Sequence, residues 1–97
     1  MISFEWDPRK DLSNQRKHGI SFSEAQTAFY NESSTIYEDD EHSSDEERYI
    51  LFGISAFLNL LAVVHCYRDD GRVIRIISAR KATNNEAKQF FNRDGRW

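Results

Sequence analysis

The stretch LNLLAVVHCYRDDGRVIRIISAR, residues 58–80, decides the fold of this chain. It holds two apolar runs on either side of Asp69-Asp70-Gly71, a turn sequence typical of a β-hairpin. We therefore expect strands over residues 58–67 and 72–80. Arg75 lies in the middle of the second run, between apolar neighbours. A charged side chain in mid-strand points to solvent or to a charged partner, so Arg75 suggests a sheet face that meets an anion.

The register of this hairpin decides which side chains share a face, because a slip of one residue turns every side chain over. A two-residue Asp-Gly turn places His65 opposite Ile76, and it leaves His65 and Arg75 on different faces. A three-residue loop places His65 opposite Arg75, with Tyr67 on the same face. We favour the three-residue loop, because the other face is then wholly apolar. That face carries Val64, Cys66, Ile74 and Ile76.

The residues before the hairpin predict two helices joined by a short loop. Asp7 and Pro8 are a typical N-cap and first helical residue, and Gly19 is typical of the position just after a helix. Ser21 and Glu24 have the spacing of a capping box, so the second helix is expected to begin there.

Four further patterns complete the domain. We expect a short strand around Phe4, strands at residues 35–37 and 48–54, and a final helix that begins at a capping box over residues 83–86. The element order β-α-α-β-β-β-α predicts one α+β domain over residues 1–97. Its antiparallel sheet is expected to have three or four strands packed against helices on one face.

Composition bounds the class of protein. The chain has 97 residues, of which 39% are hydrophobic and 13% aromatic, and these fractions favour a folded domain. Cys66 is the single cysteine, so an internal disulfide is excluded and a reducing compartment is indicated. Neither an apolar run of membrane-spanning length nor a secretory signal is visible, so we expect a cytoplasmic protein.

Charge is segregated along the chain. Residues 32–47 hold eight acidic side chains and no Lys or Arg, while the rest holds thirteen basic and eight acidic ones. The net charge of −3 therefore conceals a basic remainder. Because attraction of a polyanion depends on local potential, a basic patch for nucleic acid is compatible with this acidic chain.

Several motifs occur together in an order that resembles the BrnT family of ribonuclease toxins. The early motifs are Phe4-Glu5-Trp6-Asp7, Lys10, Asn14 and Lys17-His18-Gly19-Ile20-Ser21-Phe22-Ser23-Glu24-Ala25. The later ones are Glu47-Arg48, Gly53, Val63-Val64-His65, Arg75-Ile76-Ile77-Ser78-Ala79-Arg80, Ala82 and Glu86. The resemblance covers nearly the whole chain.

The resemblance implies a RelE-like fold and a type II toxin–antitoxin module in which RNA cleavage inhibits translation. It also implies that no metal or cofactor is used. The implied partner is a BrnA-like ribbon-helix-helix antitoxin, whose dimer binds operator DNA and is flanked by two toxins in a heterotetramer. The toxin itself is expected to contact operator DNA only through the antitoxin and not to bind a membrane.

Residue chemistry and the resemblance together nominate catalytic residues. His65 is expected to act as acid or base, because an unperturbed pKa of about 6.5 suits proton transfer; the alternative is a half-buried histidine satisfied by the backbone. Arg75 and Arg80 are expected to clamp phosphate through their planar donors, unless they form salt bridges to carboxylates. Their spacing of five residues puts them on opposite faces of a regular strand, so Arg80 lies past the strand end or a bulge re-aims it.

Further side chains are expected to bind RNA. Tyr67 is expected to complete the catalytic set with His65, Arg75 and Arg80, because it can stack on a base or donate to phosphate, although a partly buried sheet aromatic is the simpler interpretation. The expected basic contacts are Lys10, Lys17, His18, Arg48 and Lys81. The acidic run of residues 39–42 does not predict a metal site, because four adjacent residues rarely converge on one ion.

Two alternatives remain open beside the ribonuclease. The same fold can serve as a non-catalytic binding module or co-repressor that acts only with its antitoxin. A metal-dependent nuclease is the third hypothesis, and it predicts that a chelator abolishes activity.

Overall fold

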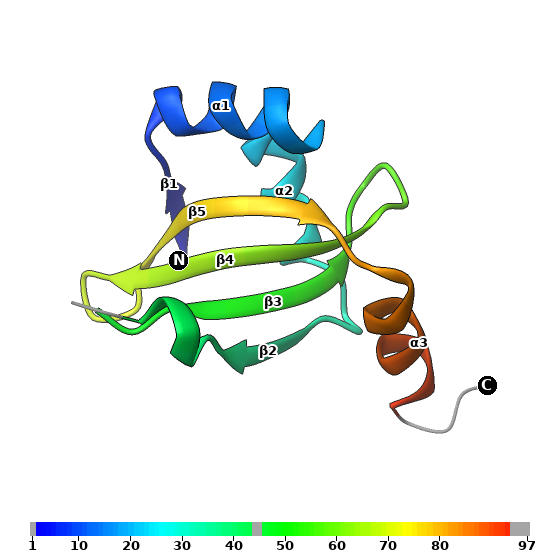
Figure 1. The fold of residues 1–97 in the computed structure, drawn as a ribbon. Coiled ribbons are helices and arrows are strands. Elements are labelled where there is room, and N and C mark those ends of the chain that lie inside the picture. Colours follow the sequence, from blue (N-terminus) through cyan, green and yellow to red (C-terminus); the bar gives the residue numbers. More distant parts are fainter. Residues whose placement is uncertain (1, 44–45, 94–97) are drawn as a thin grey trace.

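The computed structural model describes residues 2–43 and 46–93, with three helices, one 3₁₀ turn and a five-stranded sheet in these ranges (Figure 1). In chain order the elements are β1 (Ser3–Glu5), α1 (Pro8–His18), α2 (Phe22–Ala28), β2 (Thr35–Glu38), the 3₁₀ turn η1 (Asp40–His42), β3 (Tyr49–Ile54), β4 (Leu60–Arg68), β5 (Val73–Lys81) and α3 (Asn84–Asn92). The predicted α+β class is confirmed.

The sheet differs in detail from the expected one. Its order is β1-β5-β4-β3-β2, and β1 pairs with β5 in parallel while the other neighbours are antiparallel. The sheet is therefore mixed, and the expected antiparallel sheet of three or four strands was wrong. The parallel edge arises because α1 and α2 carry the chain back across the sheet after β1, as a crossover connection does.

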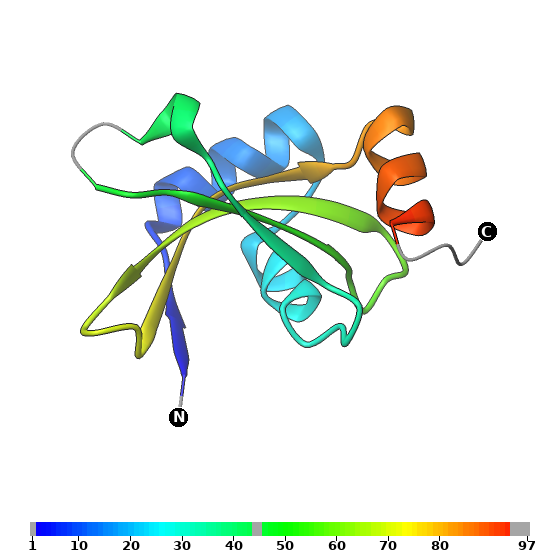
Figure 2. The same ribbon diagram turned by 90° about the horizontal axis from the view of Figure 1, so that it is seen from below.

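The expectation that all the helices pack on one face of the sheet was wrong. Helix α2 covers one face of the sheet and α1 runs along β5, whereas α3 lies on the opposite side (Figures 1 and 2). Phe90 of α3 lines one pocket with Tyr37, Ile50 and Phe52, whose side chains leave β2 and β3 on the face away from α2. We call this the open face, and the other the helical face.

Local signals at the helix ends behave largely as predicted. Asp7 accepts a hydrogen bond from the Arg9 amide, and Gly19 has φ 73° at the end of α1. The capping box of Thr83 and Glu86 is complete at α3. At α2 only half of the predicted box forms: the Ser21 side chain accepts from the Glu24 amide, whereas the Glu24 carboxylate is used elsewhere.

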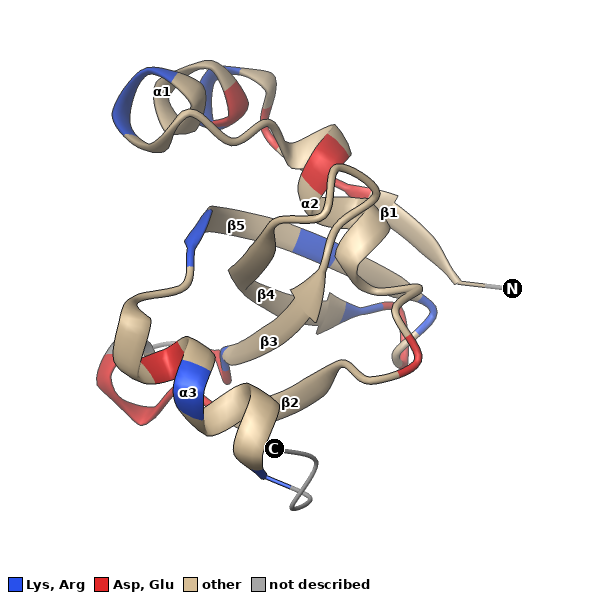
Figure 3. Ribbon diagram, turned by 90° about the vertical axis from the view of Figure 1, so that its right-hand side faces the viewer, with Lys and Arg blue, Asp and Glu red and all other residues tan. Residues whose placement is uncertain are grey.

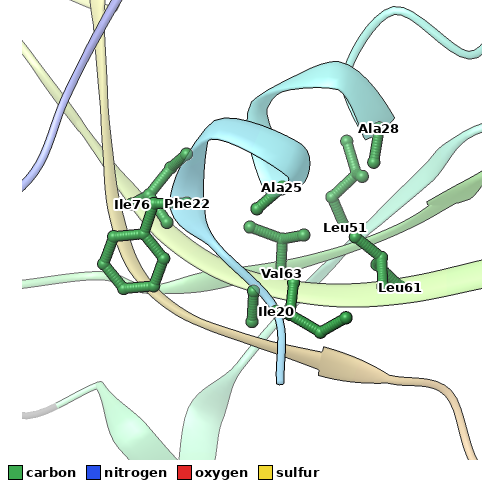
Figure 4. Close-up of a cluster of buried hydrophobic side chains, with 9 residues drawn as sticks. Ile20, Phe22, Ala25, Ala28, Leu51, Leu61, Val63 and Ile76 are labelled. Atoms are coloured by element: carbon green, nitrogen blue, oxygen red, sulfur yellow. The ribbon is translucent and has the colours of Figure 1, made fainter. Parts of the chain in front are cut away.

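The core lies between α2 and the helical face (Figure 4). Its fully buried members are Ile20, Phe22, Ala25, Ala28, Leu51, Leu61, Val63, Ile76 and Ala79. Small residues let α2 approach the sheet closely. A Cβ on Gly53 would lie 2.6 Å from the carbonyl oxygen of Ala28, so only glycine fits there.

The predicted register of the central hairpin was wrong. His65 pairs with Ile76 and Cys66 with Arg75, which is the register of the alternative two-residue Asp-Gly turn, so the favoured pairing of His65 with Arg75 does not occur. The cause is the turn, where Asp69, Asp70 and Gly71 all have positive φ values, from 52° to 85°. Four residues, 69–72, therefore separate the last pair, and aspartate tolerates this left-handed conformation.

A bulge in β5 resolves the odd spacing of Arg75 and Arg80. Val64 pairs with Ser78 but the next residue of β4, His65, pairs with Ile76, so Ile77 is an extra residue in β5. Arg75 pairs with Cys66 and Arg80 with Ala62, two β4 residues four apart. The bulge alternative is therefore confirmed, and both arginines belong to the open face.

Within residues 2–43 and 46–93, none of the helices has both the length and the apolar character needed to span a membrane.

Candidate functional site

His65 is buried in an aromatic cluster on the helical face. Its side chain is 0% exposed, and its ring packs edge-on against Phe29, with a centroid distance of 4.9 Å. Nδ1 lies 3.1 Å from the Val63 carbonyl oxygen, which can only accept, so Nδ1 carries the proton. Nε2 then accepts from the Tyr67 hydroxyl at 3.2 Å. Burial lowers the pKa of His65, so the imidazole is neutral and both nitrogens are occupied.

His65 and Tyr67 are not brought together with Arg75. Cys66 pairs with Arg75, so the neighbouring side chains of β4, His65 and Tyr67, point to the other face. The expected sheet face shared by His65, Tyr67 and Arg75 does not form. Burial of Tyr67 raises its pKa, because the ionised phenol is disfavoured there.

Arg75 belongs instead to a cluster of four charged side chains on the open face, which we call the arginine cluster: Glu5, Glu46, Arg68 and Arg75. Arg75 Nη1 donates to Glu5 Oε2 at 2.9 Å, and Arg68 Nε lies 3.8 Å from the same oxygen. Arg68 Nη2 donates to Glu46 Oε1 at 3.3 Å. All four side chains are between 31% and 46% exposed, so a solute can reach them.

Sequence reasoning missed three members of this cluster. Glu5 reaches Arg75 only because β1 pairs in parallel with β5, a contact across 70 positions that no local pattern shows. The available signal was the charged residue Glu5 between the two aromatic residues Phe4 and Trp6. In a short strand, that alternation already placed Glu5 on the face away from the core.

Arg80 lies at the other end of the open face. Its guanidinium makes two parallel hydrogen bonds to Glu86, at 2.7 and 3.0 Å, and this tethers α3 to β5. Five residues of strand correspond to about 16 Å at roughly 3.3 Å per residue. Arg75 and Arg80 are held by different carboxylates, Glu5 and Glu86, and the structure does not bring them together on one phosphate site. The hydrogen bonds from Arg80 lower the pKa of Glu86 to about 2, and the same pair raises the pKa of Arg80.

We expect Glu86→Gln to remove a pH-dependent part of the stability. The carboxyl has a pKa of 4.5 when free and about 2 in the fold, so its contribution is present above pH 4.5 and is lost as pH falls toward 2. Because Arg80 is 38% exposed, we expect only about 1 kcal/mol. Urea unfolding at several pH values should show the two proteins converging between pH 4.5 and 2. A difference in the free energy of unfolding between parent and variant that stays constant over this pH range would contradict this.

A basic groove borders the open face along β5. It is lined by Lys10, Ser13, Asn14, Lys17 and His18 of α1 and by Ile77 and Ser78 at the bulge. Figure 3 shows the basic positions of α1 beside β5. Among the described residues, neither Lys10 nor Lys17 forms an ion pair, so both ammonium groups are available to an anion.

The remaining predicted contacts differ in their surroundings. Lys81 is exposed at the end of β5, near Arg80 in sequence. Arg48 instead lines a small cavity with Glu38, Asp40, Ser43 and Glu47, where carboxylates oppose the approach of a phosphate. Within the part of the chain that the structure describes, no group of three or more His, Cys, Asp or Glu residues is arranged to hold a metal ion.

Comparisons with known proteins bear on the family and the fold of the chain. The family model described as "Ribonuclease toxin, BrnT, of type II toxin-antitoxin system" matches residues 6–86. Among solved structures, the crystal structure of the Brucella abortus ribonuclease toxin BrnT is similar, with a TM-score of 0.65 and 21% sequence identity. The match covers 87% of this chain and 100% of that one, and at this identity it shows a shared fold. A search of curated protein sequences returns no match.

Proposed function

Since the chain belongs to the BrnT family of ribonuclease toxins of type II toxin–antitoxin systems, we propose that it is an endoribonuclease that cleaves RNA without a metal ion and so inhibits translation. The observation that carries this proposal is the arginine cluster, with two guanidinium groups and two carboxylates within reach of solvent. Attack by the 2′-hydroxyl of RNA needs a base and cations on the phosphate. The cluster contains both kinds of group.

The mechanism begins with an exchange of anions. In the free protein Glu5 accepts a hydrogen bond from Nη1 of Arg75, and the phosphodiester of RNA competes for this guanidinium. When the phosphate binds Arg75 and Arg68, the carboxylate of Glu5 is released beside it. Glu5 then takes the proton of the 2′-hydroxyl, the 2′-oxygen bonds to phosphorus, and the bond to the 5′-oxygen breaks.

The two arginines stabilise the additional negative charge on the five-coordinate phosphorus, where preorganised donors are most effective. The departing 5′-oxygen takes a proton from water. The products are a 2′,3′-cyclic phosphate and a 5′-hydroxyl, and Glu5 is reset when solvent removes its proton.

The basic groove lies where flanking phosphates of the same RNA strand need counter-charges. Lys10 and Lys17 supply them beside the bulge, where His18 also lines the groove, and Arg80 lies farther along β5 toward α3. Lys81 pairs with Leu61, so its side chain leaves β5 on the helical face and lies off this path. His65 and Tyr67 have no part in the chemistry of this proposal, because they lie on the helical face. We assign them to packing around Phe29 and Tyr49.

The proposed partner is a BrnA-like ribbon-helix-helix antitoxin, as the family resemblance implies, in a heterotetramer of two toxins and an antitoxin dimer. In this arrangement operator DNA is bound only through the antitoxin. A toxin that cleaves cellular RNA acts in the cytoplasm, and the single reduced cysteine fits that compartment.

A non-catalytic co-repressor is the second candidate, and one observation favours it. Both arginines of the cluster are already paired with carboxylates in the free protein, so RNA must displace an internal partner before it binds. If the ion pairs hold, the chain binds its antitoxin but leaves RNA intact.

Cleavage chemistry distinguishes these candidates. We expect the purified chain, freed of metal with EDTA, to cut a single-stranded RNA and to leave 2′,3′-cyclic phosphate ends. An otherwise identical oligonucleotide with deoxyribose at the cleaved position should stay intact, because the attacking hydroxyl is missing. Intact RNA together with retained antitoxin binding would establish the co-repressor. Loss of cleavage with EDTA, restored by added Mg²⁺, would establish the metal-dependent nuclease.

A further inference from the structure

The helical face is only partly covered by helix. Helix α2 has seven residues and is about 10 Å long, whereas β4 and β5 have nine residues each and are about 30 Å long. Beyond the end of α2 the sheet is left without a partner. An apolar groove lies at this uncovered end, with a volume of about 660 Å³.

The groove is lined almost entirely by apolar and aromatic side chains. They are Ile2, Phe4, Phe29, Tyr30, Ser34, Ile36, Leu51, Tyr67 and Ile74, which include residues of both edge strands, β1 and β2. Four of these side chains, Ile2, Tyr30, Ile36 and Tyr67, are between 37% and 68% exposed. An exposed apolar patch of this kind on a small protein marks an interaction site.

The charge beside the groove is negative. Glu38 follows Ile36 by two residues on β2, so both side chains lie on the helical face. The Glu47 carboxylate accepts the Tyr49 hydroxyl at 2.7 Å, and the Tyr49 ring lies 5.3 Å from that of Tyr67. The hydrogen bond that Glu47 accepts from Tyr49, together with the negative charges of Glu47 and Glu38, raises the pKa of Tyr49.

These features exclude RNA and favour a peptide. No Lys or Arg lines the groove in the described part of the chain, and phosphates are repelled by Glu38 and Glu47. We infer that the groove is the antitoxin-binding surface, and that it takes an antitoxin segment with apolar side chains along one side and Lys or Arg beside Glu38 and Glu47. This inference rests on the proposed function for the identity of the partner.

The proposed antitoxin groove and the arginine cluster lie on opposite faces of the sheet. The groove lies on the helical face, while the arginine cluster lies on the open face. Antitoxin binding at the groove therefore does not require any contact with the catalytic side chains. Affinity and catalysis are carried by separate residues, and each can be changed without the other.

Ile36→Lys tests the inference, with Phe57→Lys as a matched control. Phe57 is 72% exposed at the β3–β4 turn and is not among the groove residues, so it receives the same change in charge and size elsewhere. We expect Ile36→Lys to weaken binding of the purified antitoxin, measured by calorimetry, by at least about 30-fold, which corresponds to loss of an interface hot spot. Phe57→Lys should stay within about threefold of the parent.

Two further variants extend the test. Tyr30→Ser removes a second, largely exposed groove residue and should weaken binding if Ile36→Lys proves too unstable to study. Glu38→Lys should weaken binding and also reduce its dependence on salt, since an ion pair to the antitoxin is lost. All variants should cleave RNA at the rate of the parent when the antitoxin is absent.

The outcomes separate this inference from the proposed ribonuclease activity. Unchanged antitoxin affinity in Ile36→Lys and Tyr30→Ser, in a parent that cleaves RNA, overturns the inference alone. Slower cleavage by Ile36→Lys without antitoxin also overturns it, because the groove then belongs to the substrate path. A dimer of the toxin by itself that Ile36→Lys dissociates assigns the groove to a second copy. A parent that binds antitoxin at the groove but leaves RNA intact overturns only the ribonuclease.

Discussion

Replacing Arg75 with alanine is expected to lower the rate of RNA cleavage by about 10²–10³-fold, the usual loss when one donor aimed at developing charge is removed. Arg75 pairs with Glu5 at 2.9 Å and is 31% exposed, so the change removes a surface ion pair and leaves the core untouched. The initial rate of cleavage of a defined RNA at saturating substrate is the measurement. Unfolding in urea shows in parallel that the variant remains folded.

Arg72→Ala is the matched control, because it removes the same charge only three residues away. Arg72 lies in the hairpin turn, where it pairs with Asp69 and has no contact with the cluster. Equal losses in both variants would mean that only overall positive charge matters. Arg75→Lys should keep part of the activity, since lysine restores the charge without the planar pair of donors.

Glu5→Gln tests the second role in the same site. The amide can still accept a hydrogen bond from Arg75 but cannot take a proton from the 2′-hydroxyl. If Glu5 is the base, Glu5→Gln loses most of the activity while urea unfolding shows that it stays folded. A His65→Phe variant that folds and yet loses more activity than Glu5→Gln would show that the catalytic side chains lie on the helical face.

Local features of the fold were predictable because they depend on residues close in sequence. The N-caps at Asp7, Ser21 and Thr83 each accept a backbone amide two or three residues later, so a short motif is sufficient to specify them. Gly19, whose left-handed backbone ends α1, was predictable for the same reason. Such positions need no knowledge of the rest of the chain.

The pairing of strands was harder to predict from the sequence, because it depends on turn conformation and on distant contacts. Both a two-residue Asp-Gly turn and a three-residue loop fit the sequence, and the observed register is that of the two-residue turn, with Asp69 and Asp70 at positive φ. The resulting register moved His65 into the core. The parallel pairing of β1 with β5 is set by the path of two helices, and no periodicity reports it.

The spacing of Arg75 and Arg80 predicted the path of β5 but not the partners of the two side chains. The interval between Arg75 and Arg80 already indicated that either a bulge or a strand end lay between them, and the bulge at Ile77 is present. The partners of the two side chains were not accessible from spacing. Glu5 and Glu86 reach Arg75 and Arg80 from different elements, β1 and α3.

The largest loss of stability is expected from Asn14, the polar residue that joins α1 to the sheet. Asn14 is buried, its Nδ2 donates to the carbonyl oxygens of Ile20 and Ala79 at 2.8 Å each, and its Oδ1 accepts the Ala79 amide at 3.1 Å. Because β1 pairs only with residues 73–75 of β5, the Asn14 amide takes the place of a neighbouring strand at Ala79. Three buried backbone groups therefore depend on one side chain.

Asn14→Ala leaves those three groups without partners, and each buried unsatisfied group costs about 1–3 kcal/mol. Some will recover a water, so we expect a total loss of about 3–5 kcal/mol, a large part of the roughly 5–15 kcal/mol that stabilises a domain. Urea unfolding gives the free energy, and amide exchange should accelerate at Ala79. Gln15→Ala is the control, since Gln15 is exposed on the same helix and its side chain donates to the Asp11 carboxylate. A loss in Asn14→Ala no larger than in Gln15→Ala would show that β5 does not need the hydrogen bonds of Asn14.

Asn14→Asp separates shape from hydrogen bonding. The size of the side chain is kept, but a carboxylate oxygen faces two carbonyl oxygens, so the variant should be at least as unstable as Asn14→Ala near neutral pH.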